Sequence, residues 1–243
     1  MRTARTYHPP VPRDATQTRR DLLDAAARTF AEDGVRNASM VEITRRAGQR
    51  NSGALHYHFG SREGVLCAVL AEHAEFLAQR EGELLAQARE RSDDDVASVV
   101  EAVVRPAAEL AESGWRGRSF LLILADLVEE DPATFGPELR EVLARTGGDA
   151  VYDELTRRLP ALAPDVLVER LSLMTMFILR AVADRARADE LARGPARRGR
   201  AQLPYEDFVR NLVAMVAAAV AAPEATTRPV RPRRRAAPSR STR

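Results

Sequence analysis

The stretch that decides the fold runs from Ser39 to Glu63 and reads SMVEITRRAGQRNSGALHYHFGSRE. Ser39 stands three residues before Glu42, which is the spacing of a capping box. In such a box the hydroxyl accepts the Glu42 backbone N–H, and the carboxylate reaches back to the Ser39 N–H. Gly48 supplies a residue that tolerates the left-handed conformation at a helix end. These signals predict a short helix that begins at Ser39 and ends near Ala47.

A second short helix is predicted directly after the turn. Asn51 or Ser52 can cap it, and its apolar residues Leu55 and Phe59 point inward. The outer face starts with small residues and continues with polar and aromatic ones, so its backbone can sit deep in a DNA major groove while the side chains reach base edges or phosphates. The pattern therefore favours a helix-turn-helix. The predicted DNA contacts are Ser39, Arg50, Asn51, Ser52, Gly53, Ala54, His56, Tyr57, His58 and Arg62.

The run from Arg20 to about Phe76 resembles the DNA-binding domain of the tetracycline-repressor (TetR) family. The family ends its recognition helix in a Leu-aromatic-x-His-Phe pattern, which reads Leu55-His56-Tyr57-His58-Phe59 here. His56 replaces the usual aromatic residue, and the turn is one residue longer than is usual. The resemblance implies an all-α fold, in which a three-helix helix-turn-helix domain precedes a larger helical domain. That larger domain binds an effector in the family and dimerises through its last two long helices.

Composition favours an ordinary soluble protein. The chain has 243 residues, of which 45% are hydrophobic, enough for a core in one domain or two. The single cysteine, Cys67, excludes an internal disulfide, and the start of the chain lacks the apolar core of a signal peptide. The longest apolar run, Leu212 to Ala222, is well short of the roughly 20 residues that span a bilayer. We expect a cytoplasmic protein without a membrane anchor.

Charge is distributed unevenly along the chain, although the net charge is only +2. Residues 1–66 carry 11 arginines against 7 acidic residues, whereas residues 67–188 carry 14 against 23. Residues 223–243 carry 7 arginines against one acid. A basic front and an acidic body suit a molecule that touches phosphates at one end, because the acidic body repels DNA.

Four segments follow from composition and periodicity. Residues 1–17 are rich in Pro, Thr and Arg and predict a disordered arm. Residues 18–64 form the helix-turn-helix domain, and residues 65–222 form the helical effector-binding and dimerisation domain. Residues 223–243 predict a disordered basic tail.

Every periodic segment is helical, and none alternates like a strand. The first helix is expected from Thr18 to Asp33. A single linking helix is expected from Arg62 to about Arg91, with Phe76 in its buried stripe. The remaining expected helices are Asp95–Ser113, Arg118–Glu130, Pro137–Leu159 with a break at Gly147-Gly148 as an option, Pro164–Ala188 and, after a surface loop over Ala188–Gln202, Pro204–Ala222.

The last two expected helices are apolar over most of their circumference. Leu171 and Ile178 lie on one side of the first of them, Leu173 and Phe177 lie on other sides, and Leu212 lies in the second. A helix of this kind has to be covered by more than one neighbour. The cover comes either from the same subunit or from a second copy. The resemblance favours the second copy, and hence a homodimer.

An effector pocket is expected between the linking helix and the helices of the body, where apolar lining mixes with a few polar groups. Ordinary core packing is the alternative for each candidate, and the sequence does not name the effector. The candidate lining residues are His73, Phe76, Trp115, Phe120, Tyr152, Met174 and Phe177.

Motifs for catalysis are missing from the sequence, which has no P-loop, no HExxH and no cysteine pair. His56 and His58 make a poor metal chelate, because residues two apart on a helix point to nearly opposite faces. We therefore expect no catalytic residue, no metal and no cofactor.

The sequence thus predicts a ligand-responsive transcription regulator and favours a repressor. It is expected to bind a palindromic operator in double-stranded DNA as a homodimer and to respond to an unidentified small molecule. Two alternatives remain open at this point. One is an architectural DNA-binding protein without a ligand, and the other is an all-α enzyme with a helix-turn-helix-like start.

Overall fold

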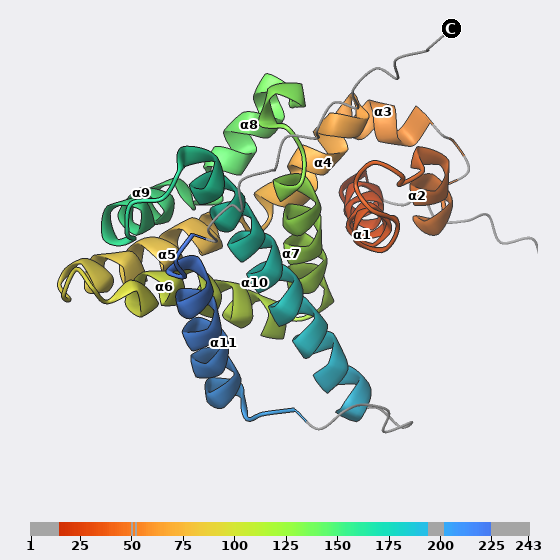
Figure 1. Cartoon of the computed structure of the whole chain (residues 1–243). Helices are drawn as coiled ribbons and strands as arrows, with labels where there is room; N and C mark the ends of the chain where they lie inside the picture. The colour runs from red at the N-terminus through yellow and green to blue at the C-terminus, as the bar shows by residue number, and fades with distance from the viewer. Residues whose placement is uncertain (1–14, 50, 52, 194–201, 225–243) are drawn as a thin grey trace, which may run out of the picture.

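Helices account for all the regular structure in the computed structural model, which describes residues 15–49, 51, 53–193 and 202–224 (Figure 1). The all-α prediction is confirmed. No helix in the described ranges is long and apolar enough to cross a membrane. The elements are α1 Ala15–Asp33, α2 Met40–Arg46, α3 Gly53–Phe59, α4 Arg62–Ala71, α5 Ala74–Arg89, α6 Val96–Glu112, α7 Trp115–Val128, the short 3-10 helix η1 Pro132–Thr134, α8 Pro137–Ala144, α9 Asp149–Arg158, α10 Pro164–Arg193 and α11 Tyr205–Val220.

The N-terminal unit, α1 to α3, lies at one side of the molecule (Figure 1). Helix α1 buries Leu22, Leu23 and Phe30, as its 3.6-residue period predicts. Gly34 follows the helix with a φ of +83°, a left-handed value that glycine adopts without strain. The helix begins at Ala15, earlier than the predicted start at Thr18, so the last residues of the predicted arm are helical.

The predicted single linking helix is wrong. Helix α4 ends at Ala71 and α5 begins at Ala74, with a turn at Glu72 and His73 between them. The break lets the two halves follow different partners, because α4 packs against α1 and α8 whereas α5 packs along α6. Phe76 is 43% exposed just after the turn, and not part of a buried stripe.

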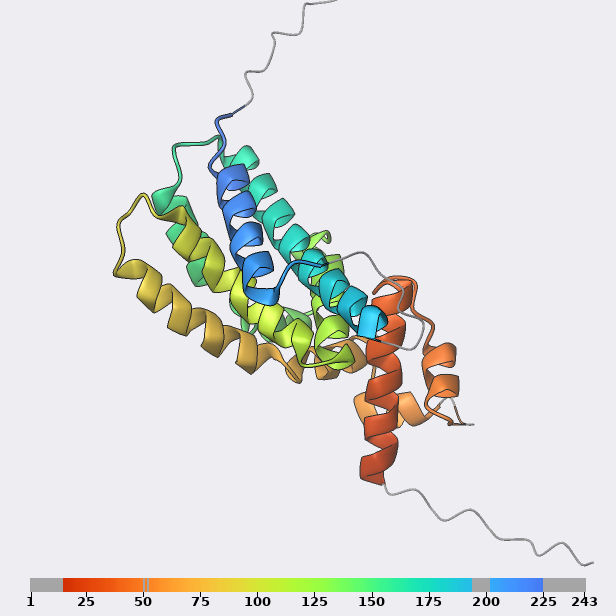
Figure 2. The same ribbon diagram turned by 90° about the horizontal axis from the view of Figure 1, so that it is seen from below.

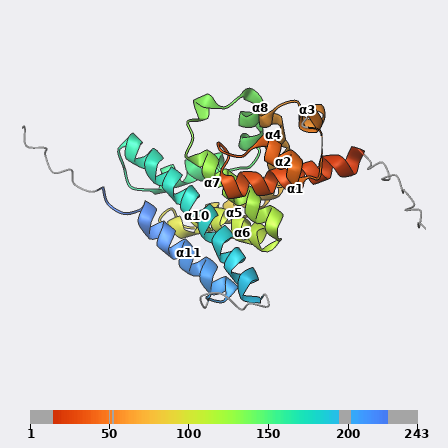
Figure 3. The same ribbon diagram turned by 90° about the vertical axis from the view of Figure 1, so that its right-hand side faces the viewer.

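The body, α4 to α11, is built around α6, α7 and α10, which pack against one another. Helix α7 supplies fully buried side chains at Leu121 and Ile123. Helix α11 lies along α6 and beside α10 (Figures 2 and 3). One continuous hydrophobic cluster therefore reaches from α1 to α11.

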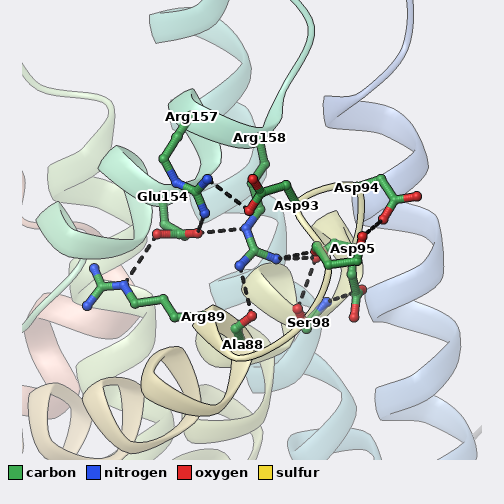
Figure 4. Close-up of polar contacts among 10 residues, drawn as sticks. Ala88, Arg89, Asp93, Asp94, Asp95, Ser98, Glu154, Arg157 and Arg158 are labelled. Carbon is green, nitrogen blue, oxygen red and sulfur yellow. Dashed lines mark hydrogen bonds and ion pairs between the residues drawn. The ribbon is translucent and has the colours of Figure 1, made fainter.

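A buried arginine fastens the start of α6 to α9 (Figure 4). The Arg158 side chain has no exposed surface and donates to Glu154 at 2.6 Å. Its other nitrogens donate to the backbone carbonyls of Ala88 at 2.8 Å, Ser92 at 3.1 Å and Asp95 at 3.0 Å. These carbonyls lie at the end of α5 and in the following turn, so one side chain holds the chain together between α5 and α6.

Several predicted boundaries change in the body. The optional break at Gly147-Gly148 is confirmed, since α8 and α9 are separate helices. Helix α10 continues to Arg193, so the predicted loop does not begin at Ala188. Residues 194–201 of that loop, residues 1–14 of the predicted arm and residues 225–243 of the predicted tail lie outside the described residues.

Candidate DNA-binding surface and effector cavity

Half of the predicted capping box is present at the start of α2. The Ser39 hydroxyl accepts the Glu42 backbone N–H at 3.3 Å, as predicted. The second half is wrong, because the Glu42 carboxylate is bound by Arg45 at 2.6 and 2.7 Å and by Arg46 at 2.9 Å. Two guanidinium groups three and four residues away outcompete one backbone N–H, since a charged donor makes the stronger bond. They hold the pKa of Glu42 at about 2.

The turn between α2 and α3 has the predicted left-handed residue, with Gly48 at a φ of +67°. The Gly48 and Gln49 backbone N–H groups donate to carbonyls in the last turn of α2, both at 3.0 Å. Asn51 starts the next helix, because its side-chain oxygen accepts the Gly53 N–H at 2.9 Å. Arg50 and Ser52, two of the predicted DNA contacts, lie outside the described residues.

Helix α3 presents two different faces. Leu55 is buried and Phe59 packs half-buried against the hydrophobic cluster, as predicted. Tyr57 is 83% exposed, and the edge of its ring lies against His58 with centroids 5.0 Å apart. Three residues are exposed on the outward face: Gly53, His56 and Tyr57. Ala54 and His58 are half-buried at the margin of this face.

Arg62, a predicted phosphate contact, is engaged inside the N-terminal half of the molecule. Its guanidinium donates to the backbone carbonyls of Val35, Arg36 and Ala38 in the loop between α1 and α2. It also lies 5.6 Å from the Phe30 ring centroid. The side chain therefore ties the start of α4 to this loop, which gives it a structural role whether or not it touches DNA.

Arg19 was not among the predicted contacts, although it lies beside α3. Its guanidinium carbon is 5.0 Å from the Phe59 ring centroid, and the residue is exposed. The start of α1 thus brings a positive charge next to the C-terminal end of α3. The adjacent pair Arg19-Arg20 in the sequence is a signal that would have found it.

Polar contacts join the N-terminal unit to the body. Asp126 of α7 accepts the Val35 backbone N–H at 3.3 Å and also binds Arg180 of α10. Glu130, just after α7, binds Arg36 of the loop between α1 and α2. These contacts couple the end of α7 to the loop that precedes α2.

A second set of contacts lies at the start of α7. Arg116 binds Asp24 of α1 at 2.6 and 2.8 Å. The guanidinium of Arg28 lies 3.7 Å from the Trp115 ring centroid, which is a cation–π contact. Trp115, a predicted effector contact, thus lies at the junction of the two units.

A cavity of about 430 Å³ lies within the body. Its walls come from α5, α6, α7, α8, α9 and α10, and they are mostly apolar. This size falls within the range of small-molecule sites, about 300 to 1,000 Å³. The aliphatic and aromatic lining includes Leu77, Val103, Leu124, Phe135, Leu143 and Leu179.

The polar side chains that line the cavity include Glu81, Tyr152 and Thr175, which come from three different helices. The Tyr152 hydroxyl of α9 lies 2.6 Å from the Thr175 hydroxyl of α10. Glu81 of α5 accepts the Gly148 backbone N–H at 2.7 Å. Burial raises the pKa of Glu81 to about 7, with a smaller contribution from the negative charge of Asp149.

One of the seven predicted effector contacts, Tyr152, lines this cavity. His73 and Phe120 stack edge to face with ring centroids 5.4 Å apart, and Met174 is buried in the core. Phe76 and Phe177 are exposed at the surface. Sequence reasoning missed Glu81, because a glutamate on a helix reads as a solvated residue when its neighbours in space are unknown.

Cys67 and the histidines within the described ranges give no second kind of site. Cys67 is buried, and burial together with the nearby carboxylates of Glu138 and Glu63 raises the pKa of its thiol to about 11. A thiol with a raised pKa is a poor nucleophile. Cys67 is therefore a small residue of the core. Across the described residues, no three His, Cys, Asp or Glu side chains come together as a metal site.

Comparison with known families matches both parts of this architecture. The family "Bacterial regulatory proteins, tetR family" matches residues 22–69, which run from α1 into α4. The family "Tetracyclin repressor-like, C-terminal domain" matches residues 101–219, which run from α6 to α11. The chain belongs to the TetR family. The resemblance read from the recognition helix is thereby confirmed, and the protein stands among the TetR-family transcriptional regulators.

Individual relatives align over short segments. The A-factor receptor protein of Streptomyces griseus is 43% identical over 58 residues, which are 24% of this chain and 21% of that protein. The HTH-type transcriptional regulator SrpR of Pseudomonas putida is 41% identical over 58 residues, 24% of this chain and 27% of that protein. The chain therefore spans no more than about a quarter of the length of these two relatives.

A solved structure shares the fold at low sequence identity. The crystal structure of a HlyIIR mutant protein superposes with a TM-score of 0.54 and 13% identity, covering 89% of this chain and 100% of that one. At this identity the likeness concerns the fold alone.

Proposed function

We propose that the protein is a ligand-responsive repressor that binds an inverted-repeat operator as a homodimer. The observation that carries the proposal is the outward face of α3. A solvated tyrosine and histidine follow a glycine there, on a helix whose other face is anchored by Leu55. Exposure of the tyrosine ring to water is unfavourable for a monomer on its own. Aromatic and polar groups exposed in this way suit contacts to base edges in a major groove.

Arg19 supports the same surface. It is exposed beside the end of α3, so it is placed to contact a phosphate when α3 enters the groove. We retain Ser39 and Asn51 as phosphate or base contacts, together with Arg50 and Ser52 outside the described residues. Arg62 contributes mainly by holding the loop between α1 and α2.

The case for a homodimer rests on the solvent-facing side of α10 and α11. Val168, Leu173 and Phe177 are exposed along α10, and Met215 is exposed on α11. The two helices lie side by side (Figure 2), and each of them exposes apolar side chains. An apolar surface of this kind fits a partner subunit.

The side chains at the centre of the proposed dimer bundle are different from those expected. Ile178 and Leu212 are buried within the subunit by its own helices. A charge placed there would unfold the subunit rather than separate two subunits. The informative changes are therefore Phe177→Asp and Met215→Asp, which leave the subunit core intact.

A response to a ligand requires that the ligand bind one arrangement of the N-terminal units better than another. Two cavity walls are connected to the N-terminal unit. Glu130 lines the cavity and binds Arg36, and α8 lines the cavity and packs against α4, which in turn packs against α1. A ligand that displaces either wall changes the position of the N-terminal unit. This cavity favours a responsive regulator over a constitutive architectural protein.

The test is selection of bound DNA from a random pool by the full chain. We expect an inverted repeat whose half-site centres lie near one helical turn apart, about 34 to 36 Å, or a small multiple of it. Tyr57→Ala should weaken binding to the selected site by roughly 1 to 3 kcal/mol, the worth of a good base contact. Phe76→Ala is the matched control, because it truncates an exposed aromatic residue outside α3.

Two outcomes would contradict the proposal. If the selection recovers no common sequence, or an asymmetric one, the protein does not bind an inverted-repeat operator as a homodimer. Equal effects of Tyr57→Ala and Phe76→Ala would mean that α3 does not read the DNA.

A further inference from the structure

Glu81 occupies an unusual position in the cavity wall. It projects from α5 toward the start of α9, where the Gly148 N–H donates to its carboxylate at 2.7 Å. A methyl group added to Gly147 would lie 2.8 Å from the same carboxylate oxygen. The glycine backbone therefore closes directly over the carboxylate, while the other side of the group faces the cavity.

No basic side chain among the described residues pairs with Glu81. The charged or titratable groups that share its cavity are Asp149 and Tyr152 of α9, Arg140 of α8 and Glu130 after α7. Asp149 adds negative charge, and Glu130 is already bound by Arg36. Arg140 lies on an exposed position of α8. The interior of the cavity thus has a carboxyl group that no cation of the described residues pairs with.

The other residues that line the cavity determine which chemical groups fit the rest of the ligand. Leu77 lies one helical turn before Glu81 on α5, and Val103, Leu124 and Leu179 come from three other helices of the wall. The paired hydroxyls of Tyr152 and Thr175 add a polar position, and Thr146 and Ser172 also line the cavity. A complementary molecule is apolar over most of its surface and carries one polar end.

We propose that the effector is a small amphipathic amine whose protonated nitrogen pairs with Glu81 and whose apolar part fills the cavity. The inference rests on the proposed ligand response and specifies its chemistry. An ammonium group donates hydrogen bonds to the carboxylate, and such charge-assisted bonds are about twice as strong as neutral ones. A carboxylate ligand would instead place a further negative charge beside Glu81 and Asp149.

Binding of the ammonium form is coupled to a proton. The Glu81 carboxyl is partly protonated near neutral pH in the free protein. An ammonium ion binds the ionised form, so the carboxyl proton is released to solvent and the nitrogen keeps its own proton. The number of protons released should rise as the pH is lowered from 8 toward 6.

The experiment compares phenylbutylamine, phenylbutanol and phenylbutanoate, which share one apolar body and differ in the charge of the end group. Binding to the full chain is measured by isothermal titration calorimetry in buffers of different ionisation enthalpy. We expect the amine to bind about tenfold or more tightly than the alcohol, with proton release, and the carboxylate to bind most weakly.

Glu81→Gln keeps the shape of the side chain and an oxygen that accepts the Gly148 N–H. It should reduce amine affinity about tenfold, abolish proton release and leave alcohol affinity unchanged. Glu75→Gln is the matched control, since it makes the same change at an exposed position of the same helix. It should behave like the wild type.

Three results would overturn the inference. They are tightest binding by the carboxylate, equal amine affinity of wild type and Glu81→Gln, and no amine binding up to millimolar concentration. Selection of DNA without any probe is an independent measurement. Failure of the amine with an operator still selected would therefore reject the effector class alone, and failure of DNA selection would reject the regulator.

Discussion

Two glutamates, one on α5 and one on α9, have opposite environments. Glu154, in the network around the α5–α6 turn, is bound by Arg89, Arg157 and Arg158, and these groups lower its pKa to about 2. Glu81, in the cavity wall, has one backbone N–H and no cation among the described residues, and burial raises its pKa to about 7. The first carboxylate is complete within the fold and has a structural role. The second is incomplete, which is the mark of a binding site.

The largest effect is expected at the structural network. Arg158→Leu removes a buried partner of Glu154 and the guanidinium that bonds to the carbonyls of Ala88, Ser92 and Asp95. The loss of a partner from a buried ion pair costs about 3 to 5 kcal/mol in unfolding free energy. Chemical denaturation measures it. Arg157→Leu, which removes an exposed partner of the same carboxylate, should cost much less. Equal losses would mean that the buried arginine has no special role.

Glu81→Gln should change the unfolding free energy in the opposite direction, so that the protein becomes more stable. The folded pKa of Glu81 is about 7, raised from its usual 4.5, so the native state binds more protons than the unfolded chain between these values. The contribution of Glu81 to stability is therefore greatest below pH 4.5 and falls as the pH rises to about 7. Glu81→Gln removes this loss and should stabilise the protein above pH 7 by on the order of 2 to 3 kcal/mol.

Denaturation curves at pH 5 and pH 8 test the sign. The gain from Glu81→Gln should be larger at pH 8, whereas a gain that is equal at both pH values would contradict the raised pKa. Glu154 differs in direction. Its lowered pKa means that its contribution is present above 4.5 and is lost as the pH falls toward 2.

A smaller effect is expected at the glycine over the cavity. Gly147→Ala places a methyl group against the Glu81 carboxylate at a residue whose φ is +88°. The left-handed conformation alone costs about 1 to 2 kcal/mol for a residue with a Cβ. Gly82→Ala is the control, because its Cβ would meet open space within α5. It should stabilise the protein by up to about 1 kcal/mol. Destabilisation by both changes would contradict this account of Gly147.

Local features of the N-terminal unit could be predicted from the sequence. The Ser39 cap, the left-handed Gly48 and the buried Leu55 each depend on residues within a few positions of one another. Such contacts follow from helical spacing and turn geometry. The break at His73 gave no signal, because no glycine or proline marks it and the cause is the packing of α4 and α5 against different partners.

The cavity could not be predicted in the same way. Its walls join residues from Leu77 to Leu179, and which side chains face it depends on how six helices pack. Tyr152 was found among the candidates, whereas Glu81 was missed. Arg158 was missed for a related reason, since a charged residue near a helix end gives no sign in sequence of complete burial.

The most direct test of the contrast between the two glutamates is the affinity of the full chain for its selected operator with and without phenylbutylamine. We predict that the amine weakens operator binding by the wild type about tenfold or more, which is a coupling of roughly 1.4 kcal/mol. Glu81→Gln should need about ten times more amine for the same weakening of operator binding. An operator affinity that the amine leaves unchanged in the wild type, or lowers equally in Glu81→Gln, would contradict the account.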